Sequence, residues 1–232
     1  MDLRDVMEKV AAITGAYSGL GAALSRIFTK EGYRLALGGK NKEELEKFAK
    51  EIGGDVLTVV MDVRNKRDCE LFIDSTAKRF GRIDLLINNA GIWKSSNIDE
   101  VSEEELDDMF KVNVFGPIYC SQAAVKVMRK QNSGHILSVG STAAIDYKVS
   151  HIAYGASKAA LIGFVGCLKT ELEGTGIRVS VFSPGGMKTK LFRSKPERLR
   201  DDFMEPDFVA GKILEHIKNP SDEWNVVLRR PK

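Results

Sequence analysis

The chain is poor in the residues that build metal sites and disulfide frameworks. Its three cysteines, Cys69, Cys120 and Cys167, lie far apart without a CxxC pair, and its three histidines lack the spacing of metal ligands. A sparse, odd set of cysteines is typical of reduced thiols in a cytoplasmic protein. We therefore expect no metal site and a cytoplasmic location, with each cysteine packed as a small apolar residue on a helix.

Long hydrophobic runs and a strong charge imbalance are also missing. No apolar run approaches the length that spans a bilayer, and the N-terminal stretch MDLRDVMEKVAAIT scatters acids through a short apolar run, unlike a signal peptide. The 35 Lys and Arg against 32 Asp and Glu leave a formal net charge of only +3, too small to indicate a nucleic acid. We expect neither a membrane nor a nucleic acid as a partner.

What the sequence does contain is a regular alternation of short apolar runs with helical segments. Parallel strands need helical crossovers of about a dozen residues, and right-handed crossovers give a doubly wound fold. No linker or repeat interrupts the pattern, so residues 1–232 are expected to form one domain. We predict an α/β Rossmann fold, a doubly wound parallel seven-stranded sheet with helices on both faces. The expected strands are KVAAIT, YRLALGG, DVLTVVMDV, DLLINNAG, HILSVGS, IRVSVFSPGG and WNVVL.

The stretch AYGASK places Tyr154 four positions before Lys158 in an expected helix from Tyr154 to about Leu172. On a helix these two side chains are neighbours, so the ammonium could lower the pKa of the phenol. A phenol tuned toward neutral pH can act as a general acid or base. An amphipathic helix whose tyrosine and lysine both face water explains these six residues equally well.

A glycine-rich turn directly follows the first strand and opens the first helix. Its sequence, TGAYSGLG from Thr14 to Gly21, has the spacing G-x-x-x-G-x-G. Such a turn lets the backbone approach a pyrophosphate, which the free N–H groups of the helix N-terminus then bind. Its place in an α/β chain indicates a dinucleotide site.

The ends of the other strands are polar or small, as a cleft at the carboxyl edge of the sheet requires. They carry Asp62-Val63, NNAG from Asn88 to Gly91, Ser138 to Ser141, and Ser183-Pro184-Gly185. Together with TGxxxGxG, a serine thirteen residues before YxxxK and Thr189 after Pro-Gly, these motifs resemble the short-chain dehydrogenase/reductase family from about Lys9 to Thr189. Among its members, the chain is similar to 3-oxoacyl-carrier-protein reductases.

The resemblance implies a catalytic group of four residues. Tyr154 would protonate the carbonyl oxygen during reduction, and Lys158 would hold the cofactor ribose and depress the tyrosine pKa. Ser141 would hydrogen-bond the substrate oxygen, and Asn113 would hold a water that relays protons to Lys158.

The resemblance also implies the contacts with the cofactor. The glycine turn would wrap the pyrophosphate, Asp62 and Val63 would border the adenine, and the end of the fourth strand would face the adenosine ribose. Met187, where the family usually has Val or Ile, and Thr189 would reach the nicotinamide. The full set is Gly15, Tyr17, Ser18, Leu20, Gly21, Gly39, Lys40, Asn41, Asp62, Val63, Asn89, Ala90, Gly91, Tyr154, Lys158, Pro184, Gly185, Met187 and Thr189.

The end of the second strand indicates the choice of cofactor. An acid at this place binds the ribose 2′-hydroxyl of NAD and repels the 2′-phosphate of NADP. Here the strand ends in Gly39 followed by Lys40, and no carboxylate occurs before Glu43. A neutral residue followed by a cation leaves space and charge for a 2′-phosphate, so we expect a preference for NADP, with NAD as the other candidate.

The substrate is expected to be a ketone or aldehyde, or the matching secondary alcohol, under a lid formed by residues 188 to about 206. This lid contains KTKLFRSKPERLR, residues 188–200, with six Lys or Arg against one Glu. The cluster favours an anionic or carrier-bound substrate, although most such runs are solvated loops.

Two other functions compete with this interpretation. A dinucleotide-binding sensor or scaffold without turnover would not need Ser141, Tyr154, Lys158 and Asn113 together. An epimerase of the extended branch would carry a TGxxGxxG turn and a longer C-terminal part. For assembly, the helices near residues 104–130 and 154–172 carry apolar and small residues expected on their exposed sides (Ala123, Ala160, Phe164). They predict a homodimer or a homotetramer with two-fold axes.

Overall fold

The computed structural model describes residues 8–189, 191, 203–219 and 221–230. Its centre is one parallel sheet of seven strands in the order β3-β2-β1-β4-β5-β6-β7. The predicted fold class is therefore confirmed. The strands are β1 (Val10–Thr14), β2 (Arg34–Gly39), β3 (Val56–Val60), β4 (Leu85–Asn88), β5 (Gly134–Val139), β6 (Ile177–Pro184) and β7 (Asn225–Leu228).

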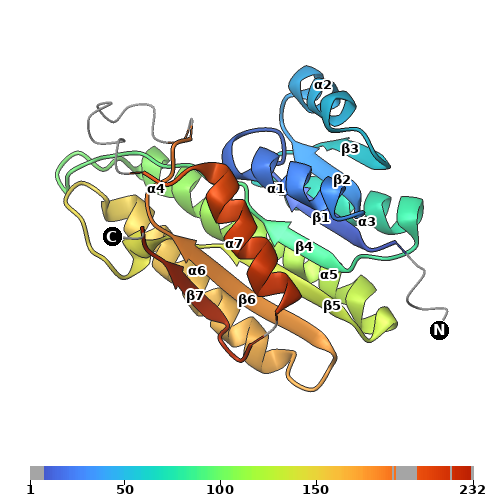
Figure 1. Ribbon diagram of the computed structural model, residues 1–232. Coiled ribbons are helices and arrows are strands. Elements are labelled where there is room, and N and C mark those ends of the chain that lie inside the picture. The colour runs from blue at the N-terminus through green and yellow to red at the C-terminus, as the bar shows by residue number, and fades with distance from the viewer. Residues whose placement is uncertain (1–7, 190, 192–202, 220, 231–232) are drawn as a thin grey trace.

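Helices cover both faces of this sheet (Figure 1). One layer holds α1 (Gly19–Lys30), α2 (Lys42–Ile52) and α7 (Pro206–Lys218), and the opposite layer holds α3 (Lys66–Phe80), α5 (Gly116–Gln131) and α6 (Ile152–Glu171). The short helix α4 (Glu103–Phe110) packs against α6.

The apolar runs of the sequence are explained by burial on both faces. In β1, Val10 and Ala12 belong to the core under α3, α5 and α6, whereas Ala11 and Ile13 belong to the core under α1, α2 and α7. Successive side chains of a strand point to opposite faces. All five residues of β1 are buried, so the strand is continuously apolar rather than alternating.

The strand order determines where on the sheet a ligand is expected to bind. Because the strands are all parallel, their carboxyl ends meet at one edge of the sheet. β1 lies between β2 and β4, so the chain leaves β1 toward one side and later returns on the other. Such a reversal point is where ligands of these sheets bind.

The segment from Glu103 to Gln131, predicted as helical, contains a local irregularity. Between α4 and α5 the chain forms a π-helical turn, η2 (Lys111–Phe115). A π turn holds one residue more than an α turn and is frequent at functional sites. It carries Asn113, which is fully buried.

Two expectations about surface and core are corrected. Cys69 on α3 and Cys120 on α5 are buried thiols, but Cys167 on α6 is exposed and does not pack. Ala123 was expected on the exposed side of its helix, yet it lies in the core with 6 % exposure. In both cases the helical periodicity is right and the face is assigned wrongly.

Helix α6 bears on the expectation that no apolar run is long enough to span a bilayer. Within the described residues it is the one helix with sufficient length and apolar character, its mean hydropathy being 1.2 over an 18-residue window. Its Leu161 and Val165 pack into the core between sheet and helices, and Ser157 and Lys158 are buried among them. A core helix of a soluble protein meets the same criteria of length and composition, so these alone do not establish a membrane span.

Candidate active site

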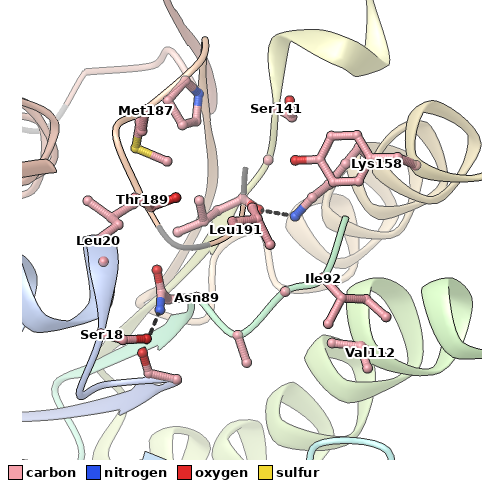
Figure 2. Close-up of a pocket in the computed structure, with 18 of the residues that line it drawn as sticks. Ser18, Leu20, Asn89, Ile92, Val112, Ser141, Lys158, Met187, Thr189 and Leu191 are labelled. Atoms are coloured by element: carbon pink, nitrogen blue, oxygen red, sulfur yellow. Dashed lines mark hydrogen bonds between the residues drawn. The ribbon is translucent and has the colours of Figure 1, made fainter. Parts of the chain in front are cut away.

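A cleft of about 470 Å³ lies over the carboxyl edge of the sheet and collects residues from most strand ends. In Figure 2, Ser141 and Lys158 lie on one side of this space, and Ser18 and Leu20 of the glycine turn lie on the other. The cleft thus joins the two motifs of the sequence that point to chemistry and to dinucleotide binding. Of the expected site residues, Gly21, Asn41 and Asn113 do not line it.

The glycine turn has the backbone that its sequence predicts. Gly15 and Gly19 have φ of +63° and +52°, where residues with a side chain are strained. A Cβ on Gly21 would overlap the carbonyl oxygen of Gly15, so Gly21 acts by letting the helix pack against the turn. The Nδ2 atom of Asn89 donates to the carbonyl oxygens of Thr14 and Gly15 at 2.9 and 3.1 Å, which ties the turn to the end of β4.

The catalytic end of the cleft is built by α6 and the loop after β5. Tyr154 and Lys158 are only 4 % and 5 % exposed, so the alternative of a solvated helix face is wrong. The Nζ atom of Lys158 donates to the carbonyl oxygen of Val139 at 2.8 Å, and it lies 5.9 Å from the centre of the Tyr154 ring. Ser141 precedes the short 3-10 turn η3 (Thr142–Ala144). Its hydroxyl accepts a hydrogen bond from the Ala143 N–H at 3.1 Å and lies near the Tyr154 phenol.

The pKa of Tyr154 differs from the sequence-based expectation. Burial raises the pKa of the phenol, and the hydrogen bond with Ser141 opposes this only in part. Burial also lowers the pKa of Lys158 to about 8. The pKa of Tyr154 is therefore raised in this structure and not lowered as expected, because the loss of hydration outweighs the stabilisation of its phenolate.

Asn113 has a position that the sequence did not indicate. Its Oδ1 accepts from the Ile92 N–H at 2.9 Å, and its Nδ2 donates to the Ile92 carbonyl oxygen at 3.0 Å and to the Ser157 hydroxyl at 3.1 Å. The side chain thus ties the loop after β4 to α6 behind the cleft. It positions the segment that carries Tyr154 and Lys158, and its expected role in holding a relay water stays a prediction.

The opposite end of the cleft holds a network of four charges. Asp62 accepts from Arg64 at 2.8 Å and from Lys40 at 3.2 Å, and Arg64 also binds Asp108 at 2.9 Å. Burial alone would raise the pKa of Asp62, but the hydrogen bonds from Arg64 and Lys40 lower it to about 2. The expected Lys40 and Asp62 are both here, whereas Arg64 and Asp108 were missed because nothing in their local sequence marks them.

Two further expected residues have structural roles. Asn41 is the N-cap of α2, its side chain accepting from the Glu44 N–H at 3.1 Å. Gly39 lies beneath the ring of Tyr17, where a Cβ would overlap Cε1 of that ring. Other lining residues were not predicted, among them Gly19, Met61, Ile92, Val112, Lys148, His151, Leu191 and Phe203. The sequence could have indicated His151 as a site residue, because it precedes Tyr154 by three positions and so lies on the same helix face.

The expected lid falls mostly outside the described residues, as does the basic cluster of residues 188–200. Its two ends are described and paired, since the Lys188 N–H donates to the Met204 carbonyl oxygen at 3.0 Å and the Met204 N–H donates to Gly186 at 2.9 Å. Leu191 and Phe203 line the cleft.

The residues present fit a dinucleotide. The glycines at positions 15 and 19 expose the backbone of the turn to the cleft, and Ser18 at the N-cap of α1 makes no side-chain capping bond. The Thr189 hydroxyl is buried without a hydrogen-bond partner in the described part of the chain, as expected of a group that bonds a ligand. In the same described residues, no three His, Cys, Asp or Glu side chains gather to hold a metal ion.

Known proteins share both the sequence and this architecture. Residues 9–200 match the family described as short chain dehydrogenase. An uncharacterized oxidoreductase of Staphylococcus aureus (strain USA300) is 35% identical over 214 residues, which are 92% of this chain and 92% of that protein. The chain therefore belongs to the short-chain dehydrogenase/reductase family and is an oxidoreductase of that family. The epimerase alternative is set aside.

Two solved structures are similar over nearly the whole chain. The 3-ketoacyl-(acyl-carrier-protein) reductase from Brucella melitensis, complexed with NADH, has a TM-score of 0.89 and 28% identity, covering 96% of this chain and 97% of that one. The alcohol dehydrogenase from the archaeon Thermococcus sibiricus, complexed with 5-hydroxy-NADP, has a TM-score of 0.88 and 29% identity, covering 97% and 99%.

Proposed function

We propose that the protein interconverts a ketone or aldehyde and the corresponding alcohol, with a preference for NADP over NAD. The observation that carries this proposal is the meeting of Ser141, Tyr154 and Lys158 at one end of a cleft whose other end is the glycine turn. A proton donor and a dinucleotide site therefore share one space. When bound, the nicotinamide supplies or accepts the hydride.

In the reduction, Tyr154 donates its phenolic proton to the carbonyl oxygen. Ser141 interacts with the phenol, so a carbonyl oxygen that approaches both hydroxyls would receive one hydrogen bond from each as negative charge develops on it. Because burial raises the pKa of Tyr154, the phenol carries its proton at neutral pH. This state suits the acid of a reduction, and the reverse reaction needs the phenolate.

Lys158 assists as a buried cation close to the phenol. Its Nζ lies 5.9 Å from the ring centre and is anchored on Val139, so its charge stabilises the phenolate that remains after proton transfer. Lys158 is buried and lines the cleft, and it would hold the ribose of a bound cofactor. Asn113 supports this arrangement through Ser157.

The preference for NADP rests on the absence of an acid at Gly39 and on Lys40. The Lys40 side chain is 62 % exposed and lies 3.2 Å from Asp62. Such an exposed pair is weak, so the ammonium can turn to a 2′-phosphate at small cost. The two similar structures carry NADH and an NADP derivative respectively, so they do not decide between the cofactors.

The test of the proposed function is Tyr154→Phe. This change removes only the hydroxyl, so folding and cofactor binding are expected to persist, while carbonyl reduction falls about a hundredfold or more. The assay follows NADPH absorbance with a panel of carbonyl compounds, and calorimetry measures cofactor binding. Wild-type turnover in the Phe variant would refute the assigned chemistry.

The competing function is a dinucleotide-binding sensor without turnover. It would bind NADPH with the affinity of an enzyme but leave every carbonyl unreduced in the same panel. Ser141 and Tyr154 line the same end of the cleft, which favours the enzyme function. A protein that only binds the dinucleotide has no use for a proton donor there.

We also propose that the protein assembles as a homodimer or homotetramer through α5 and α6. Partly exposed Phe164 and Ala160 lie on α6, and Phe115 next to α5 is 40 % exposed. Isologous packing of these helices would bury them. Light scattering at micromolar concentration should report a multiple of the 25.7 kDa chain mass. A particle of the chain mass would refute the assembly.

A further inference from the structure

The charged residues that line the cleft fall into two groups. At the adenine end, Lys40 and Arg64 are balanced by Asp62 and Asp108 through three ion pairs of 2.8–3.2 Å. At the catalytic end, the described lining residues include Lys148, His151 and Lys158 but no carboxylate. The catalytic end is therefore an electropositive pocket next to an electrically balanced one, which favours an anion there.

Asp146 and Glu105, which belong to segments that border the catalytic end, are engaged with other partners. Asp146, two positions before Lys148, binds Arg229 at 2.8 Å. Glu105 of α4 has a buried side chain that accepts from the Ser96 hydroxyl at 2.7 Å and pairs with Lys94 at 3.0 Å. Neither acid lines the cleft. The positive charge of Lys148 is thus not cancelled at this end of the cleft by the described residues.

His151 is held beside the reacting groups by two neighbouring rings. Its ring packs edge to face with Trp93, centroid to centroid 5.6 Å, and with Tyr154 at 6.1 Å. It is buried, yet it lines the cleft. Its imidazole is thus a neighbour of the Tyr154 ring in the lining of the same cleft as Ser141. A histidine ring offers an N–H donor in either of its charge states.

The loop that carries Lys148 and His151 is fastened to the loop after β4. The Ser150 carbonyl oxygen accepts from the Ser96 N–H at 3.1 Å and from the Ser95 hydroxyl at 3.2 Å. The Ser150 hydroxyl donates to Asn97 Oδ1 at 2.6 Å, and Ser150 has φ of +60°. A residue in this left-handed conformation persists only where its surroundings hold it. The loop therefore presents its basic groups from a fixed backbone.

We propose that the substrate of this site is a short oxo acid, or the matching hydroxy acid, whose carboxylate is bound by His151 and Lys148. This inference rests on the proposed function and specifies its substrate class. The ring centroids of His151 and Tyr154 are 6.1 Å apart, so a molecule whose carboxylate stands one or two carbons from its carbonyl has a length suited to contact both side chains. Such molecules are 2-oxo and 3-oxo acids. A charge-assisted contact with a carboxylate is stronger than one with a neutral group.

The experiment compares three ketones at fixed ionic strength. The short acid is 3-oxobutanoate, the neutral compound of similar shape is 2-pentanone, and the acid with a longer spacer is 5-oxohexanoate. Calorimetry with the NADP-saturated enzyme measures their binding without turnover, and NADPH absorbance measures kcat/KM. We expect 3-oxobutanoate to be preferred over each of the others by about tenfold or more in both measurements.

Variants then assign the preference to residues. His151→Phe keeps a ring between Trp93 and Tyr154 but removes the donor, and Lys148→Gln removes the charge. Each should lower the preference for 3-oxobutanoate over 2-pentanone by about fivefold or more. The control Lys47→Gln removes an exposed charge of α2, far from the cleft, and should leave the preference unchanged.

The outcomes separate this inference from the proposed function. If 2-pentanone or 5-oxohexanoate binds and reacts as well as 3-oxobutanoate, the acid recognition is refuted while the oxidoreductase stands. An unchanged preference in both variants refutes the assignment to His151 and Lys148. If no carbonyl oxidises NADPH, the proposed function fails. In that case the calorimetric preference for 3-oxobutanoate still tests whether the site binds a short oxo acid. Equal binding of the three ketones would refute that claim.

Discussion

Gly39→Asp is expected to weaken the binding of both cofactors instead of converting the enzyme to NADH. The sequence alone suggests that an acid at this position is sufficient for the conversion, since it would bind a ribose 2′-hydroxyl. In the structure, however, a Cβ on Gly39 would overlap Cε1 of Tyr17 and lie 2.6 Å from its Cδ1. The ring of Tyr17 must therefore move before the acid can be accommodated.

The magnitude follows from this overlap and from the exposure of Lys40. Overpacking of this kind costs about 1–3 kcal/mol, and Tyr17 lines the cleft, so its displacement disturbs the site for either cofactor. The Lys40 side chain is 62 % exposed, so its contact with a 2′-phosphate would be partly exposed to solvent. Such a contact is worth about 1–2 kcal/mol, or roughly tenfold in affinity. Gly39→Asp should thus lose roughly ten- to hundredfold in NADPH affinity and gain none for NADH.

A second change should restore the conversion. In Tyr17→Ser combined with Gly39→Asp, the space under the ring is free for the carboxylate, and the ratio of NADPH to NADH affinity should shift toward NADH by about tenfold or more relative to the unmutated protein. Tyr17→Ser alone is the control for loss of the ring. Calorimetric titration with each cofactor gives the four pairs of dissociation constants. If Gly39→Asp by itself binds NADH more tightly than the unmutated protein does, Tyr17 does not restrict this position and the argument is refuted.

Two titrations give further predictions. Because burial lowers the pKa of Lys158 to about 8, its charge is complete below that pH and lost above it, so kcat/KM for reduction should fall as pH rises through about 8; a profile that stays flat to pH 10 contradicts this. His135, buried on β5 and 2.8 Å from the Ser180 hydroxyl, has its pKa lowered from 6.5 to about 3 by burial and by nearby Arg178 and His216. The unfolded chain then binds the proton more readily, so stability is retained above pH 6.5 and lost as pH falls toward 3, by roughly 2 kcal/mol between pH 7 and 5. Urea unfolding of the unmutated protein and His135→Gln at both pH values measures this, and equal pH dependence of the two would show that His135 does not contribute.

The sequence predicted the features that local pattern encodes. The order of strands and helices, the glycine turn and the helical pairing of Tyr154 with Lys158 all follow from periodicity, from glycine at positions of positive φ, and from the four-residue spacing. Each of these depends on residues close together in the chain.

The parts that the sequence did not predict arise from contacts between distant segments. Arg64 reaches Asp108 across 44 positions, and Asn113 is turned away from the cleft by Ile92 and Ser157. The pKa of Tyr154 depends on how deeply α6 is buried, which spacing along one helix does not reveal. Tyr17 and Gly39 are in separate motifs, and only the sheet register brings the ring over the glycine.

The π-helical turn at Lys111–Phe115 makes the length of this segment critical. The π turn already accommodates one residue more than an α turn, and each residue of an α-helix advances by about 100° around the axis, so one further residue inserted here would rotate α4 by that angle relative to α5. Glu105 would then swing away from Ser96, and Met109 would leave its packing against Ala143 and Tyr154. A single-residue insertion, normally tolerated in a surface connection, would thus displace one wall of the site. Variation in chain length should accordingly be confined to the surrounding loops, and this helix should keep its count of residues.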